Sequence, residues 1–139
     1  MKSTTNYLSY FWLIAGDLIV LALVTVFGFA SHNEMSAGVI RYLSTFIPLL
    51  VSWLLTAPFL GAYDSDKVLD VRQLWRPFWA MVLAGPMMGL LRGLLLGTVV
   101  IPAFVIVVGG ISALALLVWR FVYLVISTKT TARKSQVHG

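Results

Sequence analysis

Residues 7–30, YLSYFWLIAGDLIVLALVTVFGFA, form an apolar stretch in which Asp17 is the only charged residue. A helix rises about 1.5 Å per residue, so this stretch is long enough to cross a bilayer core of roughly 30 Å. A carboxylate inside hydrocarbon costs about 3 kcal/mol on insertion scales, and such a group usually faces a protein interior and has a partner. The stretch therefore predicts a transmembrane helix that presents Asp17 to other helices.

A secretory signal is the alternative interpretation of this stretch, because Gly28, Phe29 and Ala30 form a small-x-small cleavage pattern. Against that interpretation, the apolar region is too long, its basic start is Lys2 alone, and Asp17 interrupts it. We therefore expect a retained membrane span.

The composition points to lipid as the main solvent of this chain. Of its 139 residues, 60% are hydrophobic and 11% are charged, with a mean hydropathy of +0.94. The absence of cysteine excludes disulfides, thiolate metal sites and cysteine nucleophiles. The net charge of +5 comes from basic residues that flank apolar runs, so anionic lipid headgroups, and not nucleic acid, are the expected partner.

Four segments have the length and polarity of transmembrane helices, at about 7–30, 42–62, 75–97 and 101–127. They predict a single all-α integral membrane bundle of four transmembrane helices over residues 1–128, with no room for a separate soluble domain. The remaining residues, 129–139, lack apolar periodicity and predict a mobile basic tail.

The distribution of basic residues predicts the orientation of the bundle. With four spans, the N-terminus, the loop 63–76 and the C-terminal tail share one side. That side carries Lys2, Lys67, Arg72, Arg76, Lys129, Arg133 and Lys134, whereas the other side carries Arg41, with Arg92 nearby. The positive-inside rule therefore places both termini in the cytoplasm. An aromatic belt is expected on the same side, formed by Tyr7, Tyr10, Trp12, Tyr63, Trp75, Trp79, Trp119 and Tyr123.

Depth in the membrane indicates which charges can meet. Asp17 lies about 15 Å from Tyr7 along a helix, and Arg120 lies about 13 Å from Lys129, measured from the same side. These two residues can therefore pair, although Arg120 is also long enough to snorkel towards the cytoplasm. Arg92 lies about 8 Å from the outer end of its span, and we expect it to snorkel to the outer headgroups.

Polar residues of the second span follow one another on a single helical face. They are Arg41, Thr45, Pro48, Ser52 and Thr56. Single hydroxyls in membrane helices often bond their own backbone, but the continuous stripe favours a face turned to the bundle. Together with the charges inside the spans, the stripe yields a candidate intramembrane polar site of Asp17, Ser52, Thr56, Arg92 and Arg120.

Small residues predict close helix packing in the third and fourth spans. Glycines recur every four residues in the third span, and small residues precede Arg120 on one face of the fourth. The predicted packing residues are Gly85, Gly89, Gly93, Gly97, Gly109 and Ala113. An open groove or pore lining is the alternative use of the glycine ridge.

The loop between the second and third spans predicts a short interfacial helix capped by Asp64, Ser65 or Asp66. Its three aspartates can be interpreted as a cation site, but a solvated turn balanced by Lys67 and Arg72 is the expectation.

Enzymatic chemistry finds little support in this sequence. His32 and Glu34 are expected to form a solvated connection, and His138 lies in the tail. No metal-ligand pair, nucleophile motif or phosphate loop is present in the sequence. We expect no catalytic residues, no cofactor and no bound metal.

Several short motifs, taken in order, resemble the bacterial and archaeal membrane family called domain of unknown function 3054. They are Gly16-Asp17-Leu18, Gly28-Phe29-Ala30-Ser31-His32, Pro58-Phe59-Leu60-Gly61-Ala62-Tyr63, Gly85-Pro86, Gly89-Leu90-Leu91-Arg92 and Trp119-Arg120. The resemblance covers about residues 8–126 and implies a four-helix integral membrane protein without an assigned activity. With a bacterial or archaeal family, the expected location is the inner (plasma) membrane of a prokaryotic cell. Phe29-Ala30 departs from the family pattern, where a basic residue is expected.

Two functional hypotheses follow from these features. The first is a non-enzymatic structural or accessory membrane protein, in which Asp17 and Arg120 form an internal pair that sets the helix arrangement. The second is a small oligomeric transporter or channel subunit that uses Asp17 with Arg120 and Arg92 as an ion or solute site. Expected partners are membrane lipids, further copies of the chain or a larger membrane complex.

Overall fold

The computed structural model describes residues 3–32, 36 and 38–137, and their side chains from residue 9 to residue 133 within those ranges. The chain forms four α-helices, namely α1 (Ser3–Ser31), α2 (Gly38–Phe59), α3 (Trp75–Leu96) and α4 (Pro102–Val137). No strand occurs within these described residues. Each helix is long and apolar enough to cross a membrane. The predicted all-α class with four membrane-spanning helices is confirmed.

The helix ends follow from local backbone chemistry. Gly61, at a φ of 67°, and the bond from Ala62 N–H to the Ala57 carbonyl, 2.9 Å, close the C-terminus of α2 in a Schellman-type turn. Gly97, at a φ of 60°, ends α3 in the same left-handed region. Pro102 begins α4, where a missing N–H leaves no hydrogen bond unmade.

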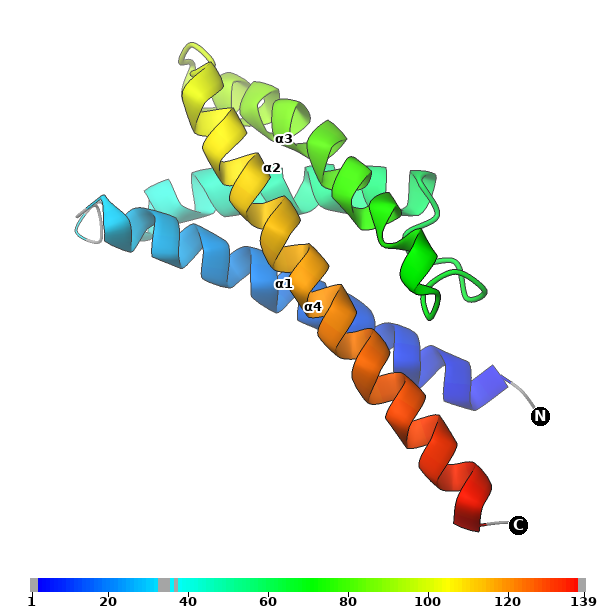
Figure 1. Ribbon diagram of the computed structural model, residues 1–139. Coiled ribbons are helices and arrows are strands. Elements are labelled where there is room, and N and C mark those ends of the chain that lie inside the picture. The colour runs from blue at the N-terminus through cyan, green and yellow to red at the C-terminus, as the bar shows by residue number, and fades with distance from the viewer. Residues whose placement is uncertain (1–2, 33–35, 37, 138–139) are drawn as a thin grey trace.

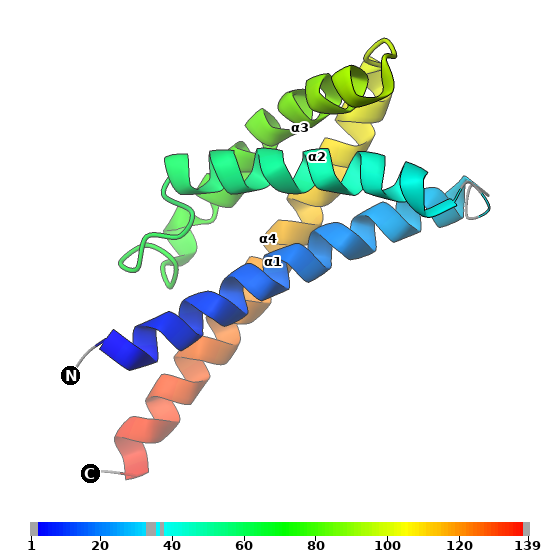
Figure 2. The ribbon, with the colours of Figure 1, turned by 180° about the vertical axis from the view of Figure 1, so that it is seen from behind.

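The four helices form an open bundle in which α1 and α4 cross (Figure 1). Seen from behind, α2 and α3 lie side by side, and α4 packs on the far side of α3 (Figure 2). The contact of α2 with α3 and that of α3 with α4 are the most extensive, while α1 contacts α2 and α4. Both termini lie at one end of the bundle, which we call the termini end; the other is the opposite end.

The apolar core lies where α2, α3 and α4 converge, and α1 contributes to it through Leu21. Its largest fully buried side chain is Trp53. Only 17–33% of each span is buried inside the bundle, so most of the helix surface is left to contact lipid or other proteins.

Two glycines of the predicted ridge lie in the contact between α3 and α4. A Cβ built on Gly85 would lie 3.7 Å from the Gly109 Cα, and one built on Gly89 would lie 2.5 Å from Val105 Cγ2. The prediction that Gly97 packs in this ridge is wrong, because a Cβ there meets nothing within 4 Å and the residue instead caps α3.

The predicted helical stripes agree largely with burial. On α2, Thr45, Pro48 and Ser52 are buried, whereas Arg41 is exposed. The face of α4 formed by Gly109, Ala113, Leu116 and Arg120 is buried throughout.

The predicted mobile tail is helical as far as Val137, and only residues 138–139 lie outside the described part. Residues 128–137 contain no proline or glycine, so each added residue extends an existing helix at little cost. Hydroxyls of Thr128, Thr130 and Thr131 donate to backbone carbonyls one turn earlier, at 2.9–3.0 Å.

The predicted interfacial helix of the loop is also wrong in its place and length. A single 3-10 turn, η2 (Val71–Gln73), occurs there, and its cap is Asp70, whose carboxylate accepts the Arg72 N–H at 2.9 Å. The predicted cap residue Asp64 instead pairs its side chain with Lys67.

Candidate functional site

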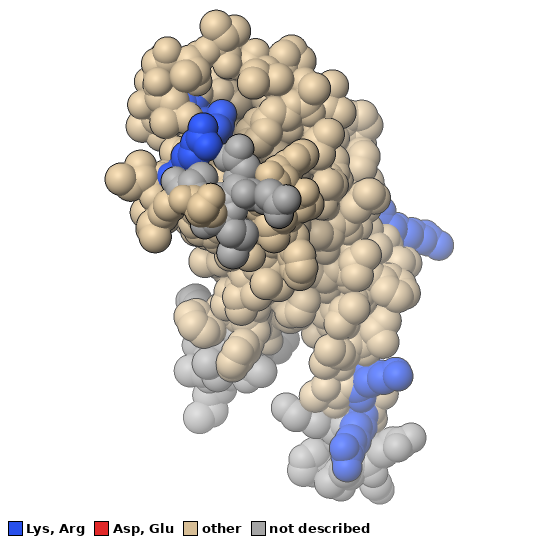
Figure 3. Space-filling model, turned by 90° about the vertical axis from the view of Figure 1, so that its left-hand side faces the viewer, with Lys and Arg blue, Asp and Glu red and all other residues tan. Residues whose placement is uncertain are grey.

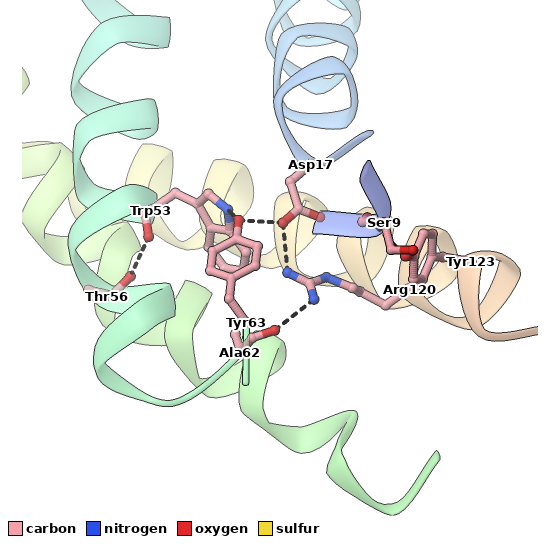
Figure 4. Close-up of polar contacts among 8 residues, drawn as sticks. All are labelled: Ser9, Asp17, Trp53, Thr56, Ala62, Tyr63, Arg120 and Tyr123. Carbon is pink, nitrogen blue, oxygen red and sulfur yellow. Dashed lines mark hydrogen bonds and ion pairs between the residues drawn. The ribbon is translucent and has the colours of Figure 1, made fainter. Parts of the chain in front are cut away.

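The central feature of the interior is an ion pair between α1 and α4. The Nη2 atom of Arg120 lies 2.7 Å from Oδ2 of Asp17, and both side chains are buried, Asp17 completely (Figure 4). The two residues that were predicted to lie at similar depth are thus in direct contact. Arg120 turns inward and does not snorkel.

Tyr63 and Trp53 extend this pair to α2 and the turn that follows it. The Tyr63 hydroxyl donates to the same Asp17 oxygen, Oδ2, at 2.5 Å. Trp53 Nε1, in turn, donates to the Tyr63 hydroxyl at 2.9 Å (Figure 4). Oδ2 of Asp17 therefore accepts hydrogen bonds from both Tyr63 and Arg120. Through Tyr63, the ion pair is also connected to Trp53 of α2.

Two arginines also close the carbonyl end of α2. Arg120 Nη1 donates to the Ala62 carbonyl at 2.8 Å, and Arg76 Nη1 donates to the Leu60 carbonyl at 2.7 Å. Positive charge at a helix C-terminus is favourable, because it compensates the partial negative charge of the macrodipole. The Arg120 guanidinium also lies 4.9 Å from the centre of the Tyr63 ring, within cation–π range.

The Tyr63 hydroxyl is kept as a proton donor by its surroundings. Burial, and then the negative charge of Asp17, raise the pKa of Tyr63 well above its ordinary value of 10.0. The phenol is therefore neutral at physiological pH and donates to the carboxylate. By contrast, the hydrogen bond and charge of Lys67 lower the pKa of the exposed Asp64.

Gly16 allows α1 to approach α4 beside the ion pair. A Cβ at this position would lie 1.9 Å from the Trp119 ring, so only glycine fits against the indole. Two residues of the predicted aromatic belt point into the bundle, since the Tyr63 hydroxyl bonds Asp17 and the Nε1 atom of Trp119 is buried. The belt prediction fails for them because a residue's depth does not reveal its azimuth around the helix.

The remaining predicted site residues do not join this polar cluster, which we define as Asp17, Trp53, Tyr63 and Arg120. Thr56 donates to the Ser52 carbonyl of its own helix at 2.9 Å, which is the local alternative for a membrane hydroxyl. Ser52 is fully buried, and its hydroxyl has no partner among the described residues.

Arg92 lies outside the polar cluster, towards the opposite end of the bundle. Its Nε donates to the Thr45 hydroxyl of α2 at 3.2 Å, and its guanidinium lies 4.8 Å from the centre of the Phe104 ring of α4. The side chain is half-buried among three helices. These contacts join α3 to α2 and α4, and the snorkelling of Arg92 to the outer headgroups stays a prediction.

The space beside the ion pair is small. A crevice of about 10 Å³ leads from the loop to Arg120, and its lining includes Ala62, Lys67, Asp70 and Arg76. That volume holds about one water molecule. Asp17 Oδ1 and Arg120 Nε are buried without a partner among the described residues. Nε and Nη2 lie on one edge of a guanidinium, and of these two atoms only Nη2 bonds the carboxylate.

Sequence reasoning missed the roles of Trp53 and Tyr63. Tyr63 was assigned to the interface because it follows the second span, and Trp53 reads as an ordinary core residue. The available signal was the turn residue Gly61, which follows Pro58 and returns the chain towards the bundle.

Among the described residues, no group of three or more histidines or acids is placed to hold a metal ion. The predicted solvated turn agrees with Asp64 paired to Lys67 and Asp70 capping η2. His32 is exposed, and Glu34 and His138 lie outside the described residues.

The chain matches the model of a known protein family. The family model described as "Protein of unknown function (DUF3054)" matches residues 14–123, which include the whole polar cluster. No curated protein and no solved structure matches this chain.

Proposed function

Since this chain belongs to the DUF3054 family of unknown function, we propose its role from the polar cluster: it is a non-enzymatic structural or accessory component of a membrane. In this role the cluster keeps α1, α2 and α4 in one arrangement, and the exposed helix surfaces contact lipid and partner proteins. We place the protein in the plasma membrane of a prokaryotic cell because of the resemblance to a bacterial and archaeal family. The distribution of basic residues supports cytoplasmic termini.

One observation carries the structural role. Asp17 is fully buried, and its Oδ2 accepts hydrogen bonds from both Tyr63 and Arg120, which lie 2.5 and 2.7 Å away. Arg120 also donates a hydrogen bond to the Ala62 carbonyl, so the charges of Asp17 and Arg120 are compensated by groups of the protein itself. Removing one member of a buried pair leaves the other uncompensated, which costs about 3–5 kcal/mol.

The size of the adjacent space also supports a structural role. A transport site must admit its solute, and the crevice beside Arg120 measures about 10 Å³. Solutes larger than water do not fit this space in the conformation described.

Folded yield tests the proposal. We expect Asp17→Asn and Arg120→Gln each to lower the fraction of detergent-extracted protein that elutes as a single species, because each leaves a buried polar group uncompensated. The charge exchange, Asp17→Arg with Arg120→Asp, should recover part of the loss. Asp66→Asn, which removes an exposed carboxylate of the loop, is the matched control and should behave like the wild type. Wild-type yield and melting temperature in both single variants would contradict the structural role.

A small oligomeric transporter or channel subunit is the second candidate. It is favoured by buried polar atoms without partners among the described residues, namely Asp17 Oδ1, Ser52 Oγ, Ser112 Oγ, Trp119 Nε1 and Arg120 Nε. This candidate predicts good folded yield in the two single variants and loss of an ion or solute flux in proteoliposomes.

A further inference from the structure

An apolar groove lies between the start of α3 and the middle of α4. Its volume is about 500 Å³, which is within the range of ligand-binding pockets. Its lining side chains are all aliphatic or aromatic, namely those of Leu74, Trp75, Phe78, Leu117, Val118 and Phe121. Three of them, Trp75, Val118 and Phe121, are 46–65% exposed. An occupant of the groove must therefore be apolar where it meets the two helices.

The size of the side chains explains why α3 and α4 separate here. The two helices contact each other at Gly85 and Gly109, because small residues allow a close approach. Towards the start of α3, the residues between the helices are instead the large Trp75 and Phe78, with Phe121 on α4. Figure 1 shows the two helices diverging from each other towards the termini end. The groove is thus open to whatever surrounds the spans.

The polar crevice described above adjoins this groove. Leu74 lines both of them. Trp75 makes a second connection, because it lines the groove and its ring centre lies 4.7 Å from the Arg76 guanidinium. Besides Arg120, the polar residues that line the crevice are Lys67, Asp70, Gln73 and Arg76. An apolar surface and a charged surface therefore meet at the start of α3.

Arg76 has a donor group left for a ligand at this junction. Its Nε donates to the Gln73 side chain at 2.6 Å, and its Nη1 donates to the Leu60 carbonyl at 2.7 Å. These two bonds hold the guanidinium against the Trp75 ring. Its Nη2 bonds no acceptor within the described part of the chain. A phosphate oxygen suits this remaining group, because the hydrogen bond would be charge-assisted.

The same junction also carries negative charge. Asp70 caps η2 through Oδ1, which accepts the Arg72 N–H at 2.9 Å, and its Oδ2 has no hydrogen bond to a described residue. Asp64 pairs with Lys67 close by. By contrast, the face of the molecule in Figure 3 shows Lys and Arg side chains and no Asp or Glu of the described residues. A headgroup with one positive and one negative group matches the mixed charges of the junction better than an anion alone.

A groove on membrane-spanning helices can be occupied by a lipid tail or by a helix of another chain. A phospholipid joins an apolar tail to a charged headgroup, and this groove ends at a charged crevice. Tryptophan is enriched at the level of the headgroups, which is where Trp75 begins α3. The arrangement of apolar and charged surfaces therefore favours a phospholipid.

We propose that the groove and the crevice together bind one phospholipid whose headgroup carries a protonated amine, as in phosphatidylethanolamine. One acyl chain lies in the groove between α3 and α4. The phosphate accepts a hydrogen bond from Nη2 of Arg76, and the ammonium group donates to Oδ2 of Asp70. Neither of these two residues belongs to the polar cluster, so the site goes beyond the proposed structural role and is independent of it.

The test is a binding measurement with the full chain in a maltoside detergent, which contains no phosphate or amine. The thermal midpoint is followed during titration with phosphatidylethanolamine in mixed micelles, and separately with phosphatidylglycerol, which lacks the amine. Ligand that binds the folded state raises the midpoint with concentration. We expect a saturable rise with phosphatidylethanolamine, at a concentration at least about tenfold lower than phosphatidylglycerol requires. Native mass spectrometry should show one phosphatidylethanolamine retained by each chain.

Val118→Trp tests the groove. The larger side chain occupies space assigned to the acyl chain, so phosphatidylethanolamine should bind at least about tenfold more weakly. Val107→Trp is the matched control, since Val107 is also an exposed valine of α4, about three turns earlier, and does not line the groove. It should bind the lipid like the wild type.

Two further variants test the headgroup contacts. Asp70→Asn keeps an oxygen that can cap η2 but removes the charge assigned to the ammonium group, so it should weaken the binding of phosphatidylethanolamine and not that of phosphatidylglycerol. Asp66→Asn changes an exposed carboxylate of the same loop that does not line the crevice, and it is the control. Arg76→Gln should weaken the binding of both lipids. If it does not fold, Arg76→Lys replaces it, because lysine keeps the charge but not the planar donors.

Three outcomes would overturn the proposal. The first is the absence of a saturable response to phosphatidylethanolamine, or an equal affinity in the wild type and Val118→Trp. The second is an equal response of the wild type to the two lipids, which would remove the role of the amine and of Asp70. The third is a dimer that Val118→Trp dissociates without any lipid response, which would assign the groove to a second copy of the chain.

Discussion

Asp17 shows how one buried carboxylate can organise a small membrane bundle. It has a short side chain that cannot reach solvent, so its charge must be compensated where it lies. The compensation comes from Arg120 on α4 and from Tyr63 in the turn after α2, at 2.7 and 2.5 Å. A single residue of α1 is thereby connected to two other segments of the chain.

The Tyr63 hydroxyl provides a pH-dependent test at this scale. Tyr63→Phe leaves Asp17 with one donor fewer and Trp53 Nε1 without its acceptor, so we expect the variant to be less stable by about 1–3 kcal/mol at pH 8. Because the folded-state pKa of Tyr63 is raised, the proton-bound folded state is favoured. The stability that the protonated hydroxyl contributes is complete below pH 10.0, the pKa of tyrosine in the unfolded state. It is lost as the pH rises from there towards the raised pKa of the folded state.

The difference in unfolding free energy between the wild type and Tyr63→Phe should therefore narrow above about pH 10. Denaturant unfolding in detergent at pH 8 and at increasing alkaline pH measures it. Tyr123→Phe, which changes a tyrosine whose hydroxyl bonds an exposed backbone carbonyl, serves as the control. A constant difference across that pH range would argue against the hydroxyl as the donor.

Helix pairs depend on where small residues meet. α3 and α4 contact each other at Gly85 and Gly109, where a Cβ built on Gly109 would lie 3.5 Å from the Gly85 Cα. Close backbone approach increases van der Waals contact, which helices in lipid need because lipid tails are as apolar as their side chains. The contact thus joins α4 to the α2–α3 pair.

Adjacent glycines on α4 test this contact with a matched pair. Gly109→Leu should separate α3 from α4 and lower the melting temperature, since the added side chain meets the α3 backbone. Gly110→Leu places the same side chain where nothing lies within 4 Å and should be tolerated. Thermal unfolding of both variants in detergent measures the effect, and equal melting temperatures would contradict the assigned contact.

Sequence patterns predicted the helices better than their ends. Apolar length gave the four helices, but the C-terminal limit of α4 was set too early at residue 127, because low hydropathy does not stop a helix that lacks proline and glycine. Similarly, Gly97 follows the four-residue period of the ridge, yet its left-handed φ of 60° makes it a cap. Periodicity identifies a face and does not reveal where the chain leaves the helix.

At the scale of the molecule, the bundle is open, and its termini lie at one end (Figure 1). Most of each span faces outward, which is the surface that a lipid bilayer or partner proteins would cover. Basic residues outnumber acidic ones by five, and most of them lie at the termini end. This asymmetry predicts that the termini end faces the cytoplasm.

The lack of native cysteine allows this orientation to be measured directly. Val99→Cys introduces a thiol at an exposed position of the turn between α3 and α4, and Asp66→Cys introduces one in the loop at the termini end. A membrane-impermeant maleimide added to intact cells should label the first and not the second. The reverse labelling pattern would show that the termini face outward.

The sequence by itself determined the membrane solvent, the four helices, and the depth at which Asp17 and Arg120 lie, because these depend on apolar length and position along a helix. Only the tertiary structure decided the azimuth of each side chain and the return of the chain after α2. Those two features place Tyr63 on Asp17 and turn Arg92 towards Thr45. The physical reason is that depth is a local property of one helix, whereas a partner is chosen by how several helices rotate and cross.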